Sequence, residues 1–116
     1  MTQEDKELLL KDLSARLPYE VKVKFYDHWA EEYEIIPLTA KLLEYTVQIE
    51  EITPYLFPMS SMTEEQIKEF NTITQKCSTY TGKSILLTDF CNKHHIDWRG
   101  LIPKDLALDA TGKNIY

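Results

Sequence analysis

The residues with the greatest capacity for chemistry lie near the end of the chain, around the stretch NKHHIDWRGLIP at 92–103. Cys91, His94 and His95 stand at positions i, i+3 and i+4, so a helix would project them from one face. A thiolate and two imidazoles suit zinc, and Cys77 could supply a fourth ligand. Zinc modules usually carry paired ligands on both sides of a loop, and here only one side is paired. We favour packed cysteines and histidines with no metal and no cofactor, and keep a small zinc-binding domain or enzyme as an alternative.

Three catalytic patterns are incomplete in this sequence. His94 or His95 could form an acid–base pair with Asp97, since imidazole titrates near neutral pH, but no further group completes a site. The serines do not lie in a Gly-x-Ser-x-Gly elbow. The string CSTYTGKS ends like a phosphate-binding loop, yet a cysteine stands where that motif needs its first glycine. We expect no catalytic residues and interpret the chain as a non-enzyme.

Length and charge narrow the remaining function classes. The chain has 116 residues and a formal net charge of −6, which fits one acidic domain over 1–116. Residues 18–60 carry three positive and eight negative side chains, and residues 81–116 carry five against four. Affinity for nucleic acid comes largely from Lys and Arg that neutralise phosphates, so direct nucleic-acid binding is disfavoured.

The apolar segments are short. The longest uninterrupted runs of aliphatic residues have three members, far fewer than the roughly 20 that a membrane-spanning helix needs. The first residues, MTQEDKELLLKDL, are acidic, whereas a secretory signal begins with basic residues. We expect a cytoplasmic protein that does not interact with membranes, with Cys77 and Cys91 as free thiols.

The first segment has the apolar spacing of a helix over about 3–16. Thr2 can cap this helix, with Asp5 three positions later. The leucines that we expect to face the core are Leu9, Leu10, Leu13 and Leu17. We expect the charged residues Lys6, Lys11 and Asp12 to lie largely in water.

In the middle of the chain the apolar period changes to two, which predicts strands. VKVKFY at 21–26 predicts a half-buried strand, and YEIIPLTA at 33–40 a second. Pro37 cannot donate to a ladder, so we expect the second strand to be bulged or to lie at an edge. The alternation in LLEYTVQI at 42–49 predicts a third strand. The prolines of TPYLFPMSSM at 53–62 predict an extended segment that crosses the end of the sheet.

Two helices are expected in the last half of the chain. Thr63 and Gln66 have the spacing of a capping box, and the helix that they open should run to about 77–80 and end before Gly82. A shorter helix is expected over about 86–95. The tail beyond it has few structural constraints, and we expect its last residues to fray.

Together these elements predict an α+β domain. It comprises an N-terminal helix in 1–17, a β-meander in 19–60, and a helical part with a tail in 61–116. A meander this short needs a cover over its apolar face, and the helices supply it. We favour a small, curled, barrel-like antiparallel sheet.

Aromatic residues are concentrated in the same middle region that carries the negative charge. Aromatic rings rimmed by charge are common at protein interfaces, although a small sheet also uses them as its core. Trp29 lies in an expected loop, where a large ring is hard to bury. We therefore predict a protein-binding surface that consists of Trp29, Glu31, Glu32 and Tyr33.

Three stretches carry a resemblance to a known family: KDLSARLPYEVKVKFYD at 11–27, ITPYLFPMSSMTEEQ at 52–66 and NKHHIDWRGLIPKDLALDATG at 92–112. They resemble a family of small uncharacterised proteins of gut anaerobes, their phages and other mobile elements. The resemblance implies that NK-x-H-(I/F)-D-(W/Y/F)-RGLI is a family signature. Its members in this chain are Asn92, His95, Asp97, Trp98, Arg99 and Gly100. No activity follows from it.

A structural role explains this signature physically. Residues 92–95 would end a helix, Ile96 and Trp98 would pack inward, and Gly100 would permit a tight turn. Arg99 would then bond a nearby carboxylate or carbonyl. We call residues 92–102 the closure motif.

The leading hypothesis is a non-enzymatic cytoplasmic accessory protein of a phage or mobile element that binds another protein as a regulator or inhibitor. A self-assembling virion or structural component stays open as an alternative, since a homo-oligomer is compatible with the sequence. The size and acidity of the chain do not distinguish the two.

Overall fold

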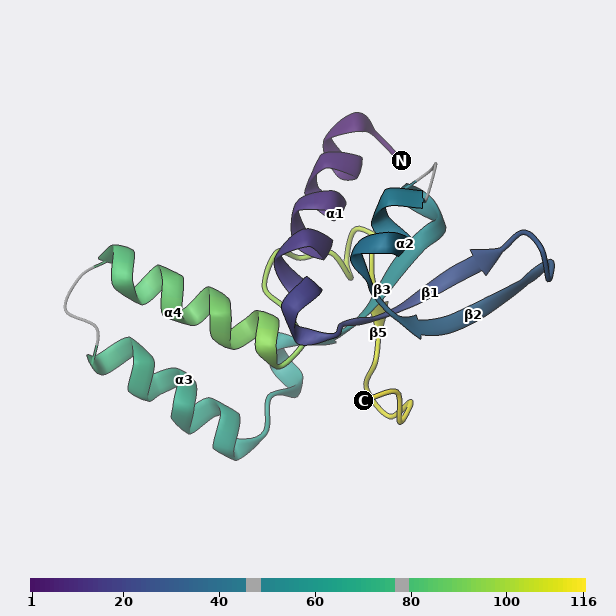
Figure 1. Ribbon diagram of the computed structural model, residues 1–116. Helices are drawn as coiled ribbons and strands as arrows, with labels where there is room; N and C mark the ends of the chain where they lie inside the picture. Colours follow the sequence, from purple (N-terminus) through teal and green to yellow (C-terminus); the bar gives the residue numbers. More distant parts are fainter. Residues whose placement is uncertain (46–48, 77–79) are drawn as a thin grey trace.

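The computed structural model describes residues 1–45, 49–76 and 80–116. Within them the chain forms four α-helices and a five-stranded mixed sheet, which confirms the predicted α+β class. The sheet is not a closed barrel, so the barrel-like arrangement that we favoured is wrong. The molecule measures 50 × 29 × 24 Å, and a β-hairpin and a helical hairpin extend from opposite sides of its body (Figure 1).

The sheet is arranged around β3 (Ile52–Pro58) in the order β2-β1-β3-β4. β1 (Lys22–Asp27) runs antiparallel to both β3 and β2 (Glu32–Pro37). Two short strands from the end of the chain, β4 (Ile96–Asp97) and β5 (Leu108–Asp109), pair with β3 in parallel. β2 therefore lies at an edge of the sheet, as its proline predicts.

The third strand, predicted over 42–49, is absent from the part of this range that the structure describes. Its first residues belong to helix α2 (Ala40–Tyr45), and residues 46–48 lie outside the described part of the chain. The hydroxyl of Thr39 accepts a hydrogen bond from the backbone N–H of Leu42 at 3.2 Å, which is an N-cap contact. This cap and the packing of two consecutive leucines against the core outweigh the alternating pattern.

The extended segment that we expected at the end of the sheet is instead its central strand, β3. Its prolines, Pro54 and Pro58, are tolerated because β3 changes neighbour along its length. It pairs with β1 over 52–54, with β5 over 55–56 and with β4 over 57–58. Each pairing of β3 with a neighbour in the described chain therefore covers three residues or fewer, so a proline interrupts little of any one ladder.

The predicted helices are present, but the last one begins earlier than expected, and the predicted end of the helix before it, at about 77–80, falls largely on residues 77–79, outside the described part of the chain. α1 (Gln3–Arg16) has the expected bounds and capping box, and α3 (Glu64–Lys76) follows its own capping box. α4 (Tyr80–Lys93) begins before the expected residue 86, and Gly82 lies within it. A single glycine costs a helix only about 1 kcal/mol, which packing further along α4 outweighs. Short 3₁₀ turns lie at Leu17–Tyr19, Ile49–Glu51 and Met59–Ser61.

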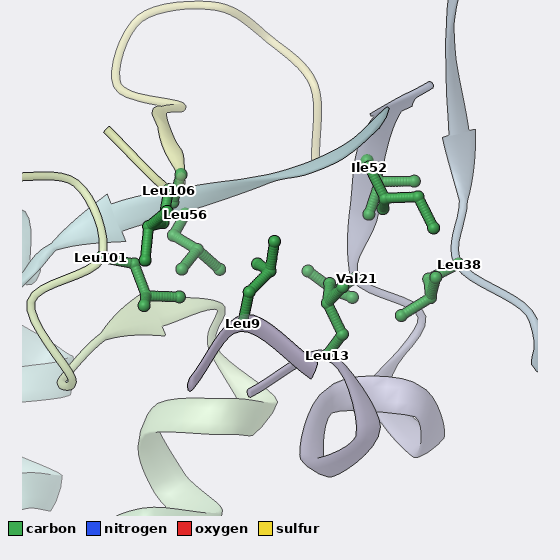
Figure 2. Close-up of a cluster of buried hydrophobic side chains, with 10 residues drawn as sticks. Leu9, Leu13, Val21, Leu38, Ile52, Leu56, Leu101 and Leu106 are labelled. Carbon is green, nitrogen blue, oxygen red and sulfur yellow. The ribbon is translucent and has the colours of Figure 1, made fainter. Parts of the chain in front are cut away.

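The main core lies where α1 packs on the sheet. Figure 2 shows side chains from α1, from the strands and from the tail pointing toward one another. The buried members are Leu9, Leu13, Val21, Val23, Leu38, Ile52, Leu56, Leu101, Leu106 and Ala107. Leu10, which we expected to face the core, is 48% exposed because it lies on the solvent side of α1.

The α3–α4 hairpin has a smaller cluster of its own. Phe90, Cys91 and Ile96 are buried there, and the partly buried residues around them are Met62, Phe70, Ile73 and Trp98. No residue of Glu64–Lys76 is fully buried. Among the described residues, no helix is long and apolar enough to cross a membrane.

Candidate functional site

The loop between β1 and β2 holds a tryptophan ring in solvent. A side-chain oxygen of Asp27, at the end of β1, accepts hydrogen bonds from the backbone N–H groups of Trp29 and Ala30 at 2.9 and 3.4 Å. This turn is typical of aspartate, and Glu31 completes the loop with a left-handed φ of 55°. The turn therefore orders the backbone at the tip, while the Trp29 side chain remains 98% exposed.

Large side chains are also exposed along β2. Tyr33 is 64% exposed and Ile35 53% exposed, and both lie on the same face of the strand because they are two residues apart. Their partners across the hairpin are Tyr26 and Lys24. The Lys24 ammonium lies 4.6 Å from the centre of the Tyr33 ring, a cation–π contact. This face of the hairpin is thus aromatic and open to solvent.

The hairpin tip is strongly acidic. Residues 27–34 contain four carboxylates and neither lysine nor arginine. Glu31 and Glu32 are exposed, and Glu34 is partly buried. The nearest basic side chain along β1 is Lys24, which already faces Tyr33. A partner that approaches the tip therefore meets a negative field around an exposed ring.

The structure brings together the residues that we predicted as a contact surface: Trp29, Glu31, Glu32 and Tyr33. Sequence reasoning missed Ile35, because the run of two isoleucines in β2 conceals which of them faces solvent. It also missed Glu51, whose carboxylate lies 2.9 Å from the ring nitrogen Nε2 of His28 at the base of the loop. Only the pairing of β1 with β3 brings positions 28 and 51 together.

The closure motif, in contrast, is directed inward. The buried Asp97 carboxylate accepts hydrogen bonds from the backbone N–H groups of Leu101 and Ile102, each at 2.9 Å. Between Asp97 and Leu101, Gly100 adopts the left-handed φ of 75° that a tight turn requires. Asp97 therefore organises the turn that returns the chain to the core.

Three further side chains of the motif, those of Asn92, Trp98 and Arg99, are joined through Trp98. The indole N–H of Trp98 donates to the side-chain oxygen of the buried Asn92 at 3.0 Å. The guanidinium of Arg99 lies 4.2 Å from the Trp98 ring, and its Nη1 lies 3.7 Å from Oδ1 of Asp12. Arg99 thus faces a carboxylate, at a distance that makes an ion pair and not a hydrogen bond.

A buried ion pair, which we did not predict from the sequence, connects this motif to α1. Asp12, which we expected in water, is fully buried, and its Oδ2 accepts a hydrogen bond from Nε of Arg16 at 2.8 Å. Nη2 of Arg16 donates to the carbonyl of Ile96 at 2.7 Å. The i, i+4 spacing of Asp12 and Arg16 was visible, but their burial depends on the end of the chain packing against α1.

His95 packs against Tyr116. Its ring stacks on the ring of Tyr116 with 3.9 Å between centres. Burial lowers the pKa of His95 from 6.5 to about 4, and Arg16 and His94 act in the same direction. The hydroxyl of Tyr116 donates a hydrogen bond to the carbonyl of Tyr55 at 2.7 Å. This residue is therefore anchored, and our expectation that the end of the tail frays is wrong.

The candidate zinc ligands do not converge in the part of the chain that the structure describes. Among those residues, no group of three or more His, Cys, Asp or Glu side chains could hold a metal. Burial raises the pKa of the Cys91 thiol, and the opposing effect of Arg16 is smaller. His94 lies 3.8 Å from a carboxylate oxygen of Glu69, and Cys77 lies outside the described residues.

Comparison of this chain with protein-family models, curated proteins and solved structures gives no match. Any functional conclusion therefore depends on the geometry of the molecule itself. Of the two regions singled out by sequence, the closure motif has Asn92, Asp97 and Trp98 hydrogen-bonded inside the domain. The hairpin has Trp29, Tyr33 and Ile35 exposed to solvent.

Proposed function

We propose that this chain is a non-enzymatic accessory protein that acts by binding another protein through its β1–β2 hairpin. The observation that carries the proposal is the exposure of Trp29, which is 98% accessible at the tip of a hairpin that extends from the body (Figure 1). Tryptophan and tyrosine are enriched among the residues that dominate binding energy at interfaces. An ordered turn fixes the backbone that carries the ring, which reduces the backbone entropy lost when a partner binds.

The edge position of β2 supports the same surface. β2 has β1 on one side and no strand of the described chain on the other. An open edge offers backbone N–H and C=O groups to an added strand, and its neighbouring side chains, Tyr33 and Ile35, give specificity. The hairpin therefore offers both backbone pairing and apolar contact to one partner.

The biological setting of the proposal comes from the sequence. The stretches 11–27, 52–66 and 92–112 resemble small proteins of gut anaerobes and their phages. We therefore place the protein among the cytoplasmic regulators or inhibitors of a phage or mobile element. Such a protein needs no catalytic site, because its effect follows from occupying a surface of its target.

Site-directed crosslinking tests this function. A photoreactive amino acid at position 29 or 35 of the full chain should crosslink to one protein in a lysate of a gut anaerobe. The same amino acid in place of exposed Lys11, on α1, should not give that product. The purified partner should bind the Trp29→Ala, Tyr33→Ala double variant at least tenfold more weakly, with unfolding unchanged. Retained affinity would overturn the assignment.

A second candidate function, self-assembly, is favoured by the α3–α4 hairpin. Ile67, Ile85 and Leu86 are 43%, 57% and 47% exposed on it. Beside them lies a pocket of about 330 Å³, lined by Met59, Phe70, Ser84, Leu87, Thr88, Cys91 and Trp98. Helices that leave apolar residues exposed can pack against a second copy. Sedimentation at micromolar concentration should then show an oligomer that Ile85→Glu dissociates, whereas a monomer excludes this function.

A further inference from the structure

A hollow lies on the open face of the sheet, where the end of β1 and the start of β2 adjoin the start of β3. It has a volume of about 280 Å³ and is lined by Tyr26, Tyr33, Glu51 and Thr53. Tyr26 and Tyr33 are direct partners across β1 and β2. Their ring centres lie 5.0 Å apart with 66° between the planes, so the two rings form adjoining walls. β-strand alternation is what places both rings on this face.

A carboxylate completes the hollow on the side of β3. Glu51 directly precedes Ile52, whose partner in β1 is Phe25, so Glu51 lies beside Tyr26 at the start of β3. His28 is the group in the described chain that contacts this carboxylate, through one of its two oxygens. Thr53 adds a hydroxyl, and neither lysine nor arginine lines the hollow. The lining therefore combines two electron-rich rings with one negative charge.

The Tyr33 ring already attracts a cation within the chain. The Lys24 ammonium lies 4.6 Å from the Tyr33 ring centre. Aromatic faces attract cations through the ring quadrupole, and the attraction grows when a carboxylate lies nearby. Further along the hairpin, residues 27–34 hold four carboxylates without a basic residue. Both the hollow and its approach thus complement positive charge.

We propose that this hollow binds the guanidinium group of an arginine in a basic segment of the partner protein. Arginine fits best because its planar group stacks on a ring while its N–H donors reach Glu51 and Thr53. The volume, slightly below the usual range for small-molecule sites, suits a single side chain. The inference rests on the proposed function only in taking the arginine from a partner protein; binding of a guanidinium group by the hollow does not depend on it.

The site can be tested with probes of defined charge on the full chain. Acetyl-arginine amide should produce saturable backbone amide shifts confined to the neighbourhood of Tyr26, Tyr33 and Glu51. Acetyl-citrulline amide, which is neutral and nearly isosteric, should produce none. Glu51→Gln and Tyr33→Leu should each lower the affinity for the arginine probe at least fivefold. Glu65→Gln, an exposed control on α3, should leave this affinity unchanged. Equal shifts with citrulline, or full affinity in Glu51→Gln, would overturn the site.

Two further outcomes separate this inference from the proposed function. If Trp29→Ala abolishes partner binding while Glu51→Gln leaves it unchanged, the hairpin binds protein but the arginine site is refuted. If the arginine probe binds and no partner protein depends on Trp29 for binding, the hollow is a guanidinium site, but the claim that the arginine comes from a partner protein is refuted. Circular dichroism of each variant, compared with the native chain, confirms that the fold is retained.

Discussion

The closure motif and the β1–β2 hairpin differ in what their side chains contact. The motif has the denser set of reactive residue types, yet Asp97, Asn92 and Trp98 all bond groups of the same domain. The hairpin tip is acidic, and its Trp29 and Tyr33 side chains are exposed to solvent. The candidate contact surface is therefore indicated by large side chains that remain exposed to solvent, and not by the presence of thiol, imidazole and carboxylate groups in one segment.

The two regions should also differ in their contribution to stability. In the motif and the helix that it packs on, charged groups are buried and paired, so removal of one partner leaves the other without compensation. At the hairpin tip the substituted side chain is already in water. Four substitution experiments test this contrast, in order of decreasing effect on stability.

Arg16→Met should have the largest effect. It removes the hydrogen bond from Arg16 to the buried Asp12 carboxylate, which then keeps only the more distant Arg99 at 3.7 Å among the described cations, and it removes the hydrogen bond to the Ile96 carbonyl. Loss of one member of a buried ion pair costs about 3–5 kcal/mol. Urea unfolding followed by circular dichroism measures the loss. Lys11→Met, exposed on the same helix, should change stability by less than about 0.5 kcal/mol. Equal values for the two variants would show that the buried pair is unimportant.

Asp97→Ala should have the next largest effect. The backbone N–H groups of Leu101 and Ile102 lose their acceptor, and one of them is buried. Hydrogen bonds to a charged group are worth about 1.5–3 kcal/mol, so we expect a loss of about 2–3 kcal/mol in thermal or urea unfolding. Asp89→Ala, at an exposed position of α4, serves as the control. A loss no greater than in the control would remove the structural role that we give to the motif.

The stability of the motif should depend on pH through His95. Its pKa is about 4 in the folded protein, below the ordinary 6.5, so the folded state favours the neutral ring. Its contribution is full above about pH 6.5 and is lost as pH falls through about 4. The native chain should therefore lose more stability on acidification than His95→Gln does. Identical pH curves for the native chain and His95→Gln would contradict the assignment.

Trp29→Ala should have the smallest effect on stability and the clearest effect on binding. Because the ring is 98% exposed, the free energy of unfolding should change by less than about 0.5 kcal/mol. Partner affinity should fall at least tenfold, which corresponds to about 1.4 kcal/mol. Leu10→Ala, an exposed apolar residue on α1, should leave both unchanged. A Trp29→Ala variant that unfolds readily would place the ring with the stabilising residues, and the contrast between the regions would fail.

Much of the local structure was predictable because it depends on neighbouring residues. The bounds of α1 follow from Thr2, Asp5 and the leucine spacing, and the first strand follows from its alternation. The middle of the chain was not predictable by the same means. Residues 42–49 alternate like a strand, but Thr39 caps a helix there, and the proline-containing segment that follows becomes the central strand. Local patterns describe periodicity, and they do not specify which segments pair.

The candidate surface was predictable in part. Trp29 was identified because a tryptophan in a short acidic loop has little chance of burial. The role of Glu51 was not, because it depends on strand pairing that joins residues 23 positions apart. The burial of Asp12 escaped prediction for a similar reason, since its partners include Arg99, far along the chain.

The α+β class, the first helix, the hairpin and the acidity of its tip follow from the sequence alone, since each is a property of consecutive residues. Which charges are buried, which strand is central and which rings lie beside which carboxylate depend on tertiary contacts. Burial and strand pairing join segments that are distant in the chain, as Arg16 bonds Ile96 and Tyr116 bonds Tyr55. Such contacts leave no periodic pattern in either segment.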